Sequence, residues 1–191
     1  MPTLPTTSPS LAVLALLKTQ PPLLDVRAPV EYQQSKLLNS FNAPILNDAE
    51  REQVGTTYRR DGHDAAVLLG RELVSGTIRT QRIEQWQKYC LENTDAQIMC
   101  WRGGLRSALA QQWLAAQGVQ RERVAGGFKA VRHGSLHVLA NPQKRWWLVS
   151  GRTGSAKTPL IQSLENGIDL EGLANHRGSA FGRRMTPQPT T

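Results

Sequence analysis

The stretch that decides the fold is IMCWRGGLRSAL, residues 98–109, where apolar residues lead into Cys100 and a loop with two glycines and two arginines follows. An apolar pattern typical of a helix begins at Ser107. A strand that runs through a glycine loop into a helix directs backbone N–H groups, and the positive end of the helix dipole, at whatever the loop holds. With Arg102 and Arg106 nearby, we expect the Cys100 thiol to ionise near neutral pH and to act as a nucleophile.

The second cysteine, Cys90, lies in a helical pattern without such a loop, so we expect it to be a core residue. Two cysteines and no sign of export favour reduced thiols over a disulfide framework. The histidines show no metal-ligand spacing to either cysteine, so we expect no bound metal. They are His63, His133, His137 and His176.

Strands and helices alternate on both sides of the opening stretch. The elements that we expect are a helix over 10–18, a buried strand in PPLLDVR (21–27), a helix from Pro29, helices between Asp48 and Asn93, a strand at 97–100, a helix over 107–117 and a strand near 123–125. This alternation predicts an α/β fold with a mainly parallel sheet and helices on both faces.

A second motif, GRTGSAKT at 151–158, follows RWWLVS (145–150), which we expect to form a strand. It matches a Walker A loop except that Ala156 replaces the second glycine. In such a loop the backbone N–H groups surround phosphates, Lys157 neutralises charge and Thr158 is available to Mg²⁺. Because Asn-Pro at 141–142 precedes this segment, we expect two domains, 1–140 and 141–191.

The net charge of +8 is concentrated towards the C-terminus. Residues 1–120 carry 12 Lys and Arg against 11 Asp and Glu, whereas residues 121–191 carry 11 against 4. Such a block fits either a polyanionic partner, RNA foremost, or a solvated surface. The early apolar run 11–17 is too short to span a bilayer and follows no basic residue, so we expect a cytoplasmic protein without a membrane anchor or signal peptide.

Three segments resemble rhodanese-like domains: LLDVRAPVEY (23–32) their early signature, the loop after Cys100 their active-site loop, and VAGGFKAVR (124–132) their closing strand and turn. In that family the loop cysteine carries sulfur, or in some cases selenium, as a persulfide or perselenide. Five residues separate Cys100 from Arg106, where common sulfur-transferring rhodaneses have four, and the longer loop resembles the phosphatase branch of the fold. A sulfurtransferase, a cysteine-dependent phosphatase and a non-catalytic RNA-binding remnant all stay open at this point.

A rhodanese-like domain joined to a P-loop resembles the bacterial tRNA 2-selenouridine synthase family, and VGTTYRRDGHDAA (54–66) and NGIDLEGLANHRGSAFG (166–182) strengthen the resemblance. It implies that selenium from selenophosphate replaces the 2-thio group of wobble uridines in tRNA, and that geranyl diphosphate geranylates the same group. The residues that it implies are Cys100 as the nucleophile; Arg102, Gly103, Gly104 and Arg106 as ligands of an anionic donor; and Gly151, Gly154, Lys157 and Thr158 as ligands of a diphosphate or nucleotide.

The sequence departs from this family at its C-terminal end. Family members continue through a long P-loop domain, whereas this sequence stops 34 residues after Lys157. A phosphate-binding sheet needs further strands and usually an acidic residue on Mg²⁺. We therefore expect a C-terminally truncated homologue whose rhodanese-like half folds, whose segment after Asn141 is loosely held, and which does not complete the tRNA modification unaided.

Overall fold

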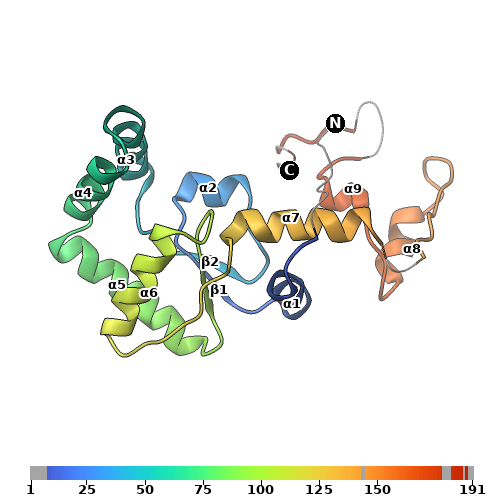
Figure 1. Cartoon of the computed structure of the whole chain (residues 1–191). Coiled ribbons are helices and arrows are strands. Elements are labelled where there is room, and N and C mark those ends of the chain that lie inside the picture. Colours follow the sequence, from blue (N-terminus) through green and yellow to red (C-terminus); the bar gives the residue numbers. More distant parts are fainter. Residues whose placement is uncertain (1–7, 143–144, 178–181, 187, 189–191) are drawn as a thin grey trace. The chain divides into compact units, whose positions relative to one another are not determined.

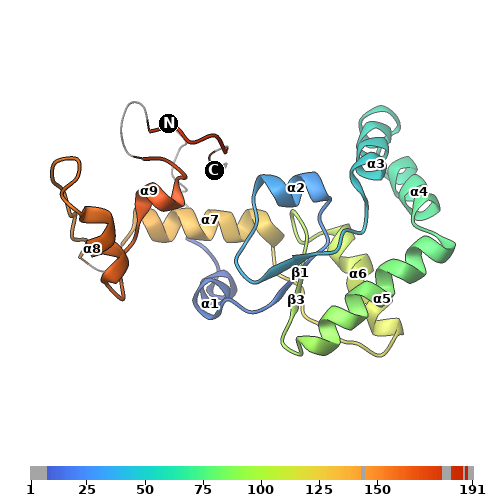
Figure 2. The same ribbon diagram turned by 180° about the vertical axis from the view of Figure 1, so that it is seen from behind.

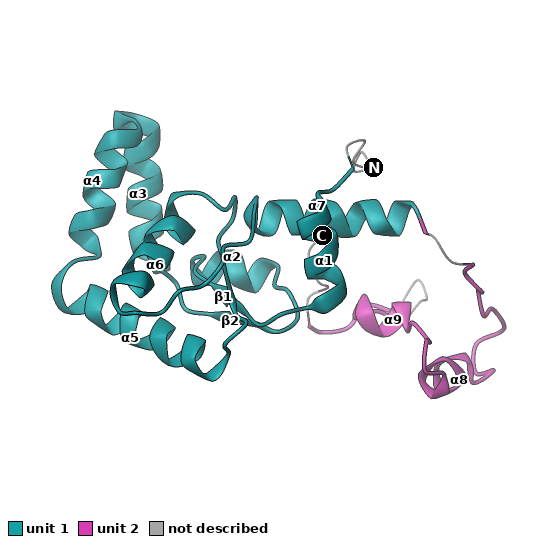
Figure 3. Cartoon of the chain, turned by 60° about the horizontal axis from the view of Figure 1, so that its bottom comes forward, with its two compact units in different colours: residues 1–141 teal, residues 142–191 magenta. Residues whose placement is uncertain are grey.

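The computed structural model describes residues 8–142, 145–177, 182–186 and 188. It separates into two compact units, Met1–Asn141 and Pro142–Thr191, which Figure 3 shows in teal and magenta. The first unit contains the cysteine loop, and the second contains the Walker-like segment.

A three-stranded parallel sheet forms the centre of the first unit (Figure 1). Its strands are, in sheet order, β2 (Ser40–Asn42), β1 (Leu23–Asp25) and β3 (Gln97–Met99). A parallel bridge between Ile98 and Arg123 extends the pairing beyond β3, so the strand expected near 123–125 is reduced to one bridged residue. All of β1 is buried, as is typical of a middle strand covered on both faces.

In the described part of the first unit, residues 8–141, seven helices surround or extend this sheet. They are α1 (Leu11–Thr19), α2 (Pro29–Gln34), α3 (Asp48–Asp61), α4 (His63–Leu73), α5 (Gly76–Glu92), α6 (Leu105–Ala116) and α7 (Gly127–Ala140). Among the described residues, no helix is long and apolar enough to cross a membrane.

Alternate strand residues divide between two apolar cores. Leu24 and Ile98 belong to the core that α5 and α6 complete, whereas their neighbours Leu23 and Met99 belong to the core that α1 and α7 complete. Successive side chains of a strand point to opposite faces, so each face of the sheet receives its own helical layer (Figures 1 and 2). The predicted α/β fold with helices on both faces is confirmed.

α3 and α4 form a hairpin joined at Gly62, whose φ of 89° lies in the left-handed region that favours glycine. Asn47 and Glu50 begin α3 with reciprocal hydrogen bonds between each side chain and the other residue's backbone N–H. Glu50 also pairs with Arg82 of α5 at 2.7 Å, and both side chains are largely buried. These contacts hold the hairpin opposite the beginning of α6.

The second unit contains α8 (Lys157–Ser163) and α9 (Leu170–Leu173). The strand expected over 145–150 was a wrong prediction, because this segment has no regular secondary structure. A strand needs a neighbouring strand for its backbone hydrogen bonds, and no described residue pairs with this segment. Trp147 and Leu148 are each 87% exposed, so the apolar run that suggested a buried strand lies on the surface of the described structure.

Candidate active site

Cys100 follows β3 directly and lies at the carboxyl end of the parallel sheet, the edge where open α/β sheets bind ligands. Only 3% of the residue is exposed. Its thiol donates to the Ser107 hydroxyl at 3.3 Å, and that hydroxyl donates to the Gly104 carbonyl at 3.1 Å. Because Ser107 is fully buried in the first turn of α6, the thiol is held at the base of the loop.

The cysteine loop packs directly against the turn that begins α7. Gly103 has a φ of +64°, and a Cβ at this position would lie 2.9 Å from the backbone nitrogen of Gly126. A Cβ on Gly127 would lie 2.2 Å from the carbonyl oxygen of Cys100. Both glycines are therefore required by backbone-to-backbone packing, whereas the space beside Gly104 is open.

The carbonyl groups and the N–H groups of the loop backbone differ in their hydrogen bonding. The carbonyls of Cys100 and Trp101 accept from the N–H groups of Phe128 and Lys129 at 2.9 and 3.0 Å. The N–H groups of residues 101–107, in contrast, have no acceptor within the described structure. Unpaired N–H groups that run into a helix N-terminus favour anions, so the loop is equipped for an anionic substrate.

Arg106 forms a bidentate ion pair with Glu31 of α2, with nitrogen–oxygen distances of 2.5 and 3.1 Å. Glu31 also accepts a hydrogen bond from the Ala28 N–H at the beginning of α2. Burial by itself would raise the pKa of Glu31, but the hydrogen bond and charge of Arg106, together with the Ala28 N–H, lower it below its usual value. An anion that binds Arg106 must therefore share it with Glu31.

The pKa of Arg106 also reflects its surroundings. Burial would lower the pKa, but the hydrogen bond and charge of Glu31 raise it, with smaller contributions from Cys100 and Asp25. Among the described residues, Arg106 is therefore a cation within electrostatic reach of Cys100. Arg102, the other arginine of the loop, is exposed and has no ion-pair partner in the described part of the chain.

A buried ion pair supports the loop from β1. Asp25 and Arg27 are both 0% exposed and approach to 2.7 Å. The Arg27 guanidinium also lies 4.0 Å from the centre of the Phe128 ring, which stacks on Trp101 at 5.5 Å. Since Trp101 is the residue after Cys100, we assign Asp25 and Arg27 a structural role beneath the loop.

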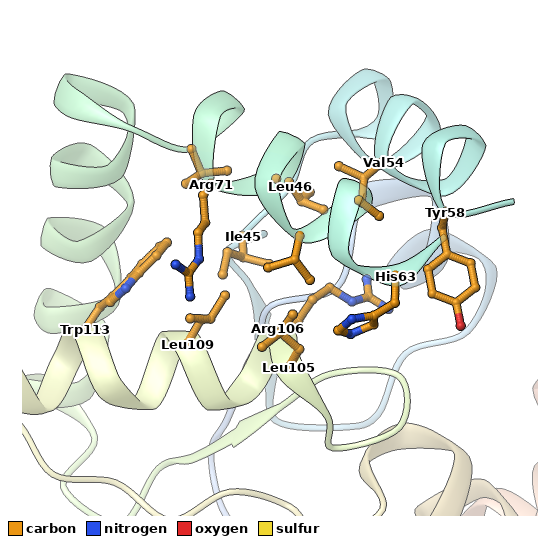
Figure 4. A pocket seen from close by; sticks show the side chains of 14 residues that line it. Ile45, Leu46, Val54, Tyr58, His63, Arg71, Leu105, Arg106, Leu109 and Trp113 are labelled. Atoms are coloured by element: carbon orange, nitrogen blue, oxygen red, sulfur yellow. The ribbon is translucent and has the colours of Figure 1, made fainter. Parts of the chain in front are cut away.

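An apolar cavity of about 250 Å³ lies between the α3–α4 hairpin and α6 (Figure 4). Aliphatic and aromatic side chains make up most of its wall, and Arg106 lies at one end. Its lining comprises Ile45, Leu46, Val54, Tyr58, His63, Ala66, Val67, Gly70, Arg71, Val74, Leu105, Arg106, Leu109 and Trp113.

A second cavity, of about 710 Å³, adjoins the apolar one and is lined by charged side chains of α2 and α3. Arg51 and Arg59 contribute positive charge, and Glu31, Asp48 and Glu52 contribute negative charge. Arg106 lines both cavities, as do three residues of the apolar wall. An apolar site and a charged site therefore meet at one arginine near Cys100.

In the second unit, the Walker-like segment forms an exposed loop that leads into α8. The Lys157 ammonium donates to the carbonyls of Gly151 and Arg152, each at 2.9 Å. Gly154 has a φ of +82° and Ala156 one of +56°, so the loop places an alanine in a left-handed conformation that a glycine adopts without strain. Gly151 and Gly154 thus lie in the loop, and Lys157 and Thr158 begin the helix that follows it.

The chain is 48% identical over 176 residues to the tRNA 2-selenouridine synthase of Hydrogenovibrio crunogenus. It is 46% identical over 179 residues to the tRNA 2-selenouridine synthase of Marinobacter nauticus. The chain is a homologue of tRNA 2-selenouridine synthase. The sequence profile of the tRNA 2-selenouridine synthase AAA domain also matches residues 144–191 of this homologue.

This synthase homologue spans about half the length of the curated relatives it matches, 49% of each, although 88% and 93% of its own length is aligned. Its fold is similar to the solved N-terminal domain of a protein from Clostridium difficile 630 that is described as ATP/GTP binding. The TM-score is 0.53 at 30% sequence identity, covering 60% of this chain and 88% of that one.

One residue of the site in this synthase homologue, Glu31, is not apparent from the sequence patterns. Glu31 contacts Arg106 across 75 positions of sequence, a long-range contact that no local pattern shows. A local signal did exist, because Glu31 is the third residue of the helix that Pro29 begins, where glutamate caps the preceding backbone. Cys90 lies fully buried in the core, as expected.

Proposed function

We propose that this chain provides the chalcogen-handling site for an exchange on tRNA, in which selenium from selenophosphate replaces the 2-thio sulfur of a wobble uridine, and that it does not complete this exchange unaided. The observation that carries the proposal is Cys100, held at the carboxyl edge of the sheet in a homologue of the selenouridine synthases. Cys100 serves as the nucleophile that handles the chalcogen. The unpaired N–H groups of residues 101–107, with Gly103 and Gly104 among them, surround the phosphate of the donor.

The arginines have separate roles in this proposal. Arg106 adds charge at the base of the loop, where it is shared between Glu31 and the donor. Arg102 is exposed and meets the anionic substrate at the entrance. Arginine suits both tasks because its planar guanidinium binds phosphate oxygens through two parallel hydrogen bonds.

A second reaction of the same chain, transfer of a geranyl group from geranyl diphosphate, is supported by the apolar cavity. The volume of about 250 Å³ lies just below the range of about 300–1,000 Å³ that is typical of small-molecule sites, and an apolar wall suits a hydrocarbon chain. Arg51, Arg59 and Arg106 line the charged cavity beside it, together with Glu31, Asp48 and Glu52, and in this proposal the three arginines hold the diphosphate. In this reaction the thio sulfur attacks C1 of the geranyl group, the C1–oxygen bond breaks, and diphosphate leaves with the electron pair.

The partner that we propose is tRNA carrying 2-thiouridine, in the cytoplasm. The excess of Lys and Arg after residue 120 suits the phosphate backbone of an RNA. The Walker-like loop with Gly151, Gly154, Lys157 and Thr158 would hold a diphosphate or nucleotide, with its N–H groups and the Lys157 ammonium on the phosphates.

The test is chemical trapping on the whole chain. After incubation with a persulfide donor, which passes its outer sulfur to the Cys100 thiolate and leaves as the free thiol, mass spectrometry should find one sulfur atom added at Cys100, and Cys100→Ser should abolish it. Cys90→Ser is the matched control and should leave the adduct intact. Rapid hydrolysis of an aryl phosphate through Cys100, without any chalcogen adduct, would instead support a cysteine-dependent phosphatase and overturn the proposal.

A further inference from the structure

The apolar cavity is elongated along α6. Figure 4 shows Arg106 and His63 towards one end, and Trp113 with the Arg71 side chain at the other. Arg106 also lines the charged cavity, so that end faces the proposed diphosphate site. Seven residues of α6 separate Arg106 from Trp113, and at 1.5 Å per residue this corresponds to about 10 Å.

Trp113 forms a firm end wall for this cavity. Its ring stacks on Trp86 with centroids 6.0 Å apart and an interplanar angle of 14°. The Arg79 guanidinium lies 5.4 Å from the centre of the same ring. Trp86 itself is fully buried and donates from its indole N–H to the Ala43 carbonyl at 2.9 Å. Since the partner ring is anchored to the backbone, Trp113 cannot move aside without breaking a packed stack.

We propose that Trp113 sets the length of the prenyl chain that this cavity accepts, admitting a C10 diphosphate and excluding a C15 one. The inference rests on the proposed geranyl transfer and names the residue that limits it. A C–C bond is about 1.5 Å long, so the eight-carbon backbone of a geranyl chain extends roughly 9 Å and the twelve-carbon backbone of a farnesyl chain roughly 14 Å. Compared with the roughly 10 Å that the rise of α6 gives between Arg106 and Trp113, only the geranyl chain is short enough.

The Arg71 side chain also limits the length of the prenyl chain that the cavity accepts. It lies beside Leu109 and Trp113 at the far end of the cavity, so a longer chain would have to pass a charged guanidinium as well as the indole ring. Within the described ranges no carboxylate pairs with Arg71, so an apolar chain placed against it costs hydration of the cation without a compensating contact. The end wall is therefore both a steric and a polar limit.

The experiment measures equilibrium binding of dimethylallyl (C5), geranyl (C10) and farnesyl (C15) diphosphates to the purified full chain by isothermal titration calorimetry. The wild-type chain should bind the C10 compound at least tenfold more tightly than the C15 compound, since pockets discriminate by about that factor for each group that does not fit. Trp113→Ala should remove this preference while leaving C10 binding within a fewfold. Trp147→Ala, a change of the same type at an 87% exposed position, is the control and should change neither.

A second variant covers the case in which Trp113→Ala does not fold. Leu109→Trp fills the cavity one helical turn before Trp113 and should weaken C10 binding at least tenfold while C5 binding persists. If Trp113→Ala folds and binds C10 with an unchanged C10-to-C15 ratio, or Leu109→Trp leaves C10 binding unchanged, Trp113 does not set the length and geranyl transfer still stands. If the wild-type chain binds none of the three diphosphates, the proposed geranyl transfer itself fails.

Discussion

Replacing Glu31 by Gln separates the two roles of Arg106, because it removes the carboxylate but keeps the size of the side chain. The ion pair is bidentate, and the side chains of Arg106 and Glu31 are 26% and 12% exposed. Exposed pairs contribute up to about 1 kcal/mol and breaking buried ones costs about 3–5 kcal/mol, so Glu31→Gln should lower the free energy of unfolding by roughly 1–3 kcal/mol. Urea denaturation followed by circular dichroism measures this loss.

The same change should strengthen anion binding at the loop. With Glu31 replaced by a neutral side chain, the Arg106 guanidinium is no longer paired with a carboxylate. Inorganic phosphate should therefore bind about tenfold more tightly, a difference of about 1.4 kcal/mol in binding free energy. Glu52→Gln is the matched control, because Glu52 lines the same charged cavity but is exposed. If phosphate affinity stays unchanged or falls in Glu31→Gln while Glu52→Gln behaves as wild type, Arg106 does not bind the anion.

The stability difference between wild type and Glu31→Gln should also depend on pH. The folded pKa of Glu31 is lowered, so the stability that this carboxylate contributes is fully present above its unfolded pKa. It should disappear as the pH falls through the lower folded pKa. Equal pH profiles for the two proteins in this acidic range would show that the ion pair does not stabilise the fold.

Three further predictions concern the loop and its support. Gly127→Ala places a Cβ 2.2 Å from the Cys100 carbonyl at a φ of +60°, so it should lower the free energy of unfolding by roughly 2–4 kcal/mol in a urea titration and abolish chalcogen loading at Cys100. Asp25→Asn leaves Arg27 as a buried cation without its charge partner and should cost about 3–5 kcal/mol in the same titration, whereas a loss below about 1 kcal/mol would contradict the structural role. Iodoacetamide should label Cys100 before Cys90 at neutral pH, as followed by peptide mass spectrometry, because burial raises the pKa of Cys90; faster labelling of Cys90 would contradict the assignment of the nucleophile.

The sequence predicted the fold where local patterns and tertiary structure agree. The apolar run that ends at Asp25 and the one that ends at Cys100 became adjacent parallel strands, since each is buried on both faces. β2 was missed because Ser40–Asn42 holds a single apolar residue at the edge of the sheet. The segment 145–150 has the composition of a strand, but its described surroundings offer no partner for pairing.

The site was predictable only in part, because some of its residues are neighbours in the sequence and others meet only through contacts between distant helices. Cys100, Gly103 and Arg106 lie within one loop, so their nearness to each other follows from the sequence alone. The apolar cavity depends on how the α3–α4 hairpin approaches α6, and the end wall depends on a stack between Trp86 and Trp113. Contacts between distant helices leave no periodic signal in a single sequence, so neither feature could be predicted.

Arg106 lines the charged cavity and also lies at the base of the cysteine loop. Anions that bind at these two places are therefore coupled through one guanidinium. A single guanidinium cannot fully neutralise two anions at once, so a diphosphate in the charged cavity and a phosphate in the cysteine loop would each weaken the binding of the other. Thermodynamic linkage makes this antagonism equal in both directions. If the two proposed co-substrates bind there, the chain would handle them in turn, because one would have to depart before the other reached its full affinity.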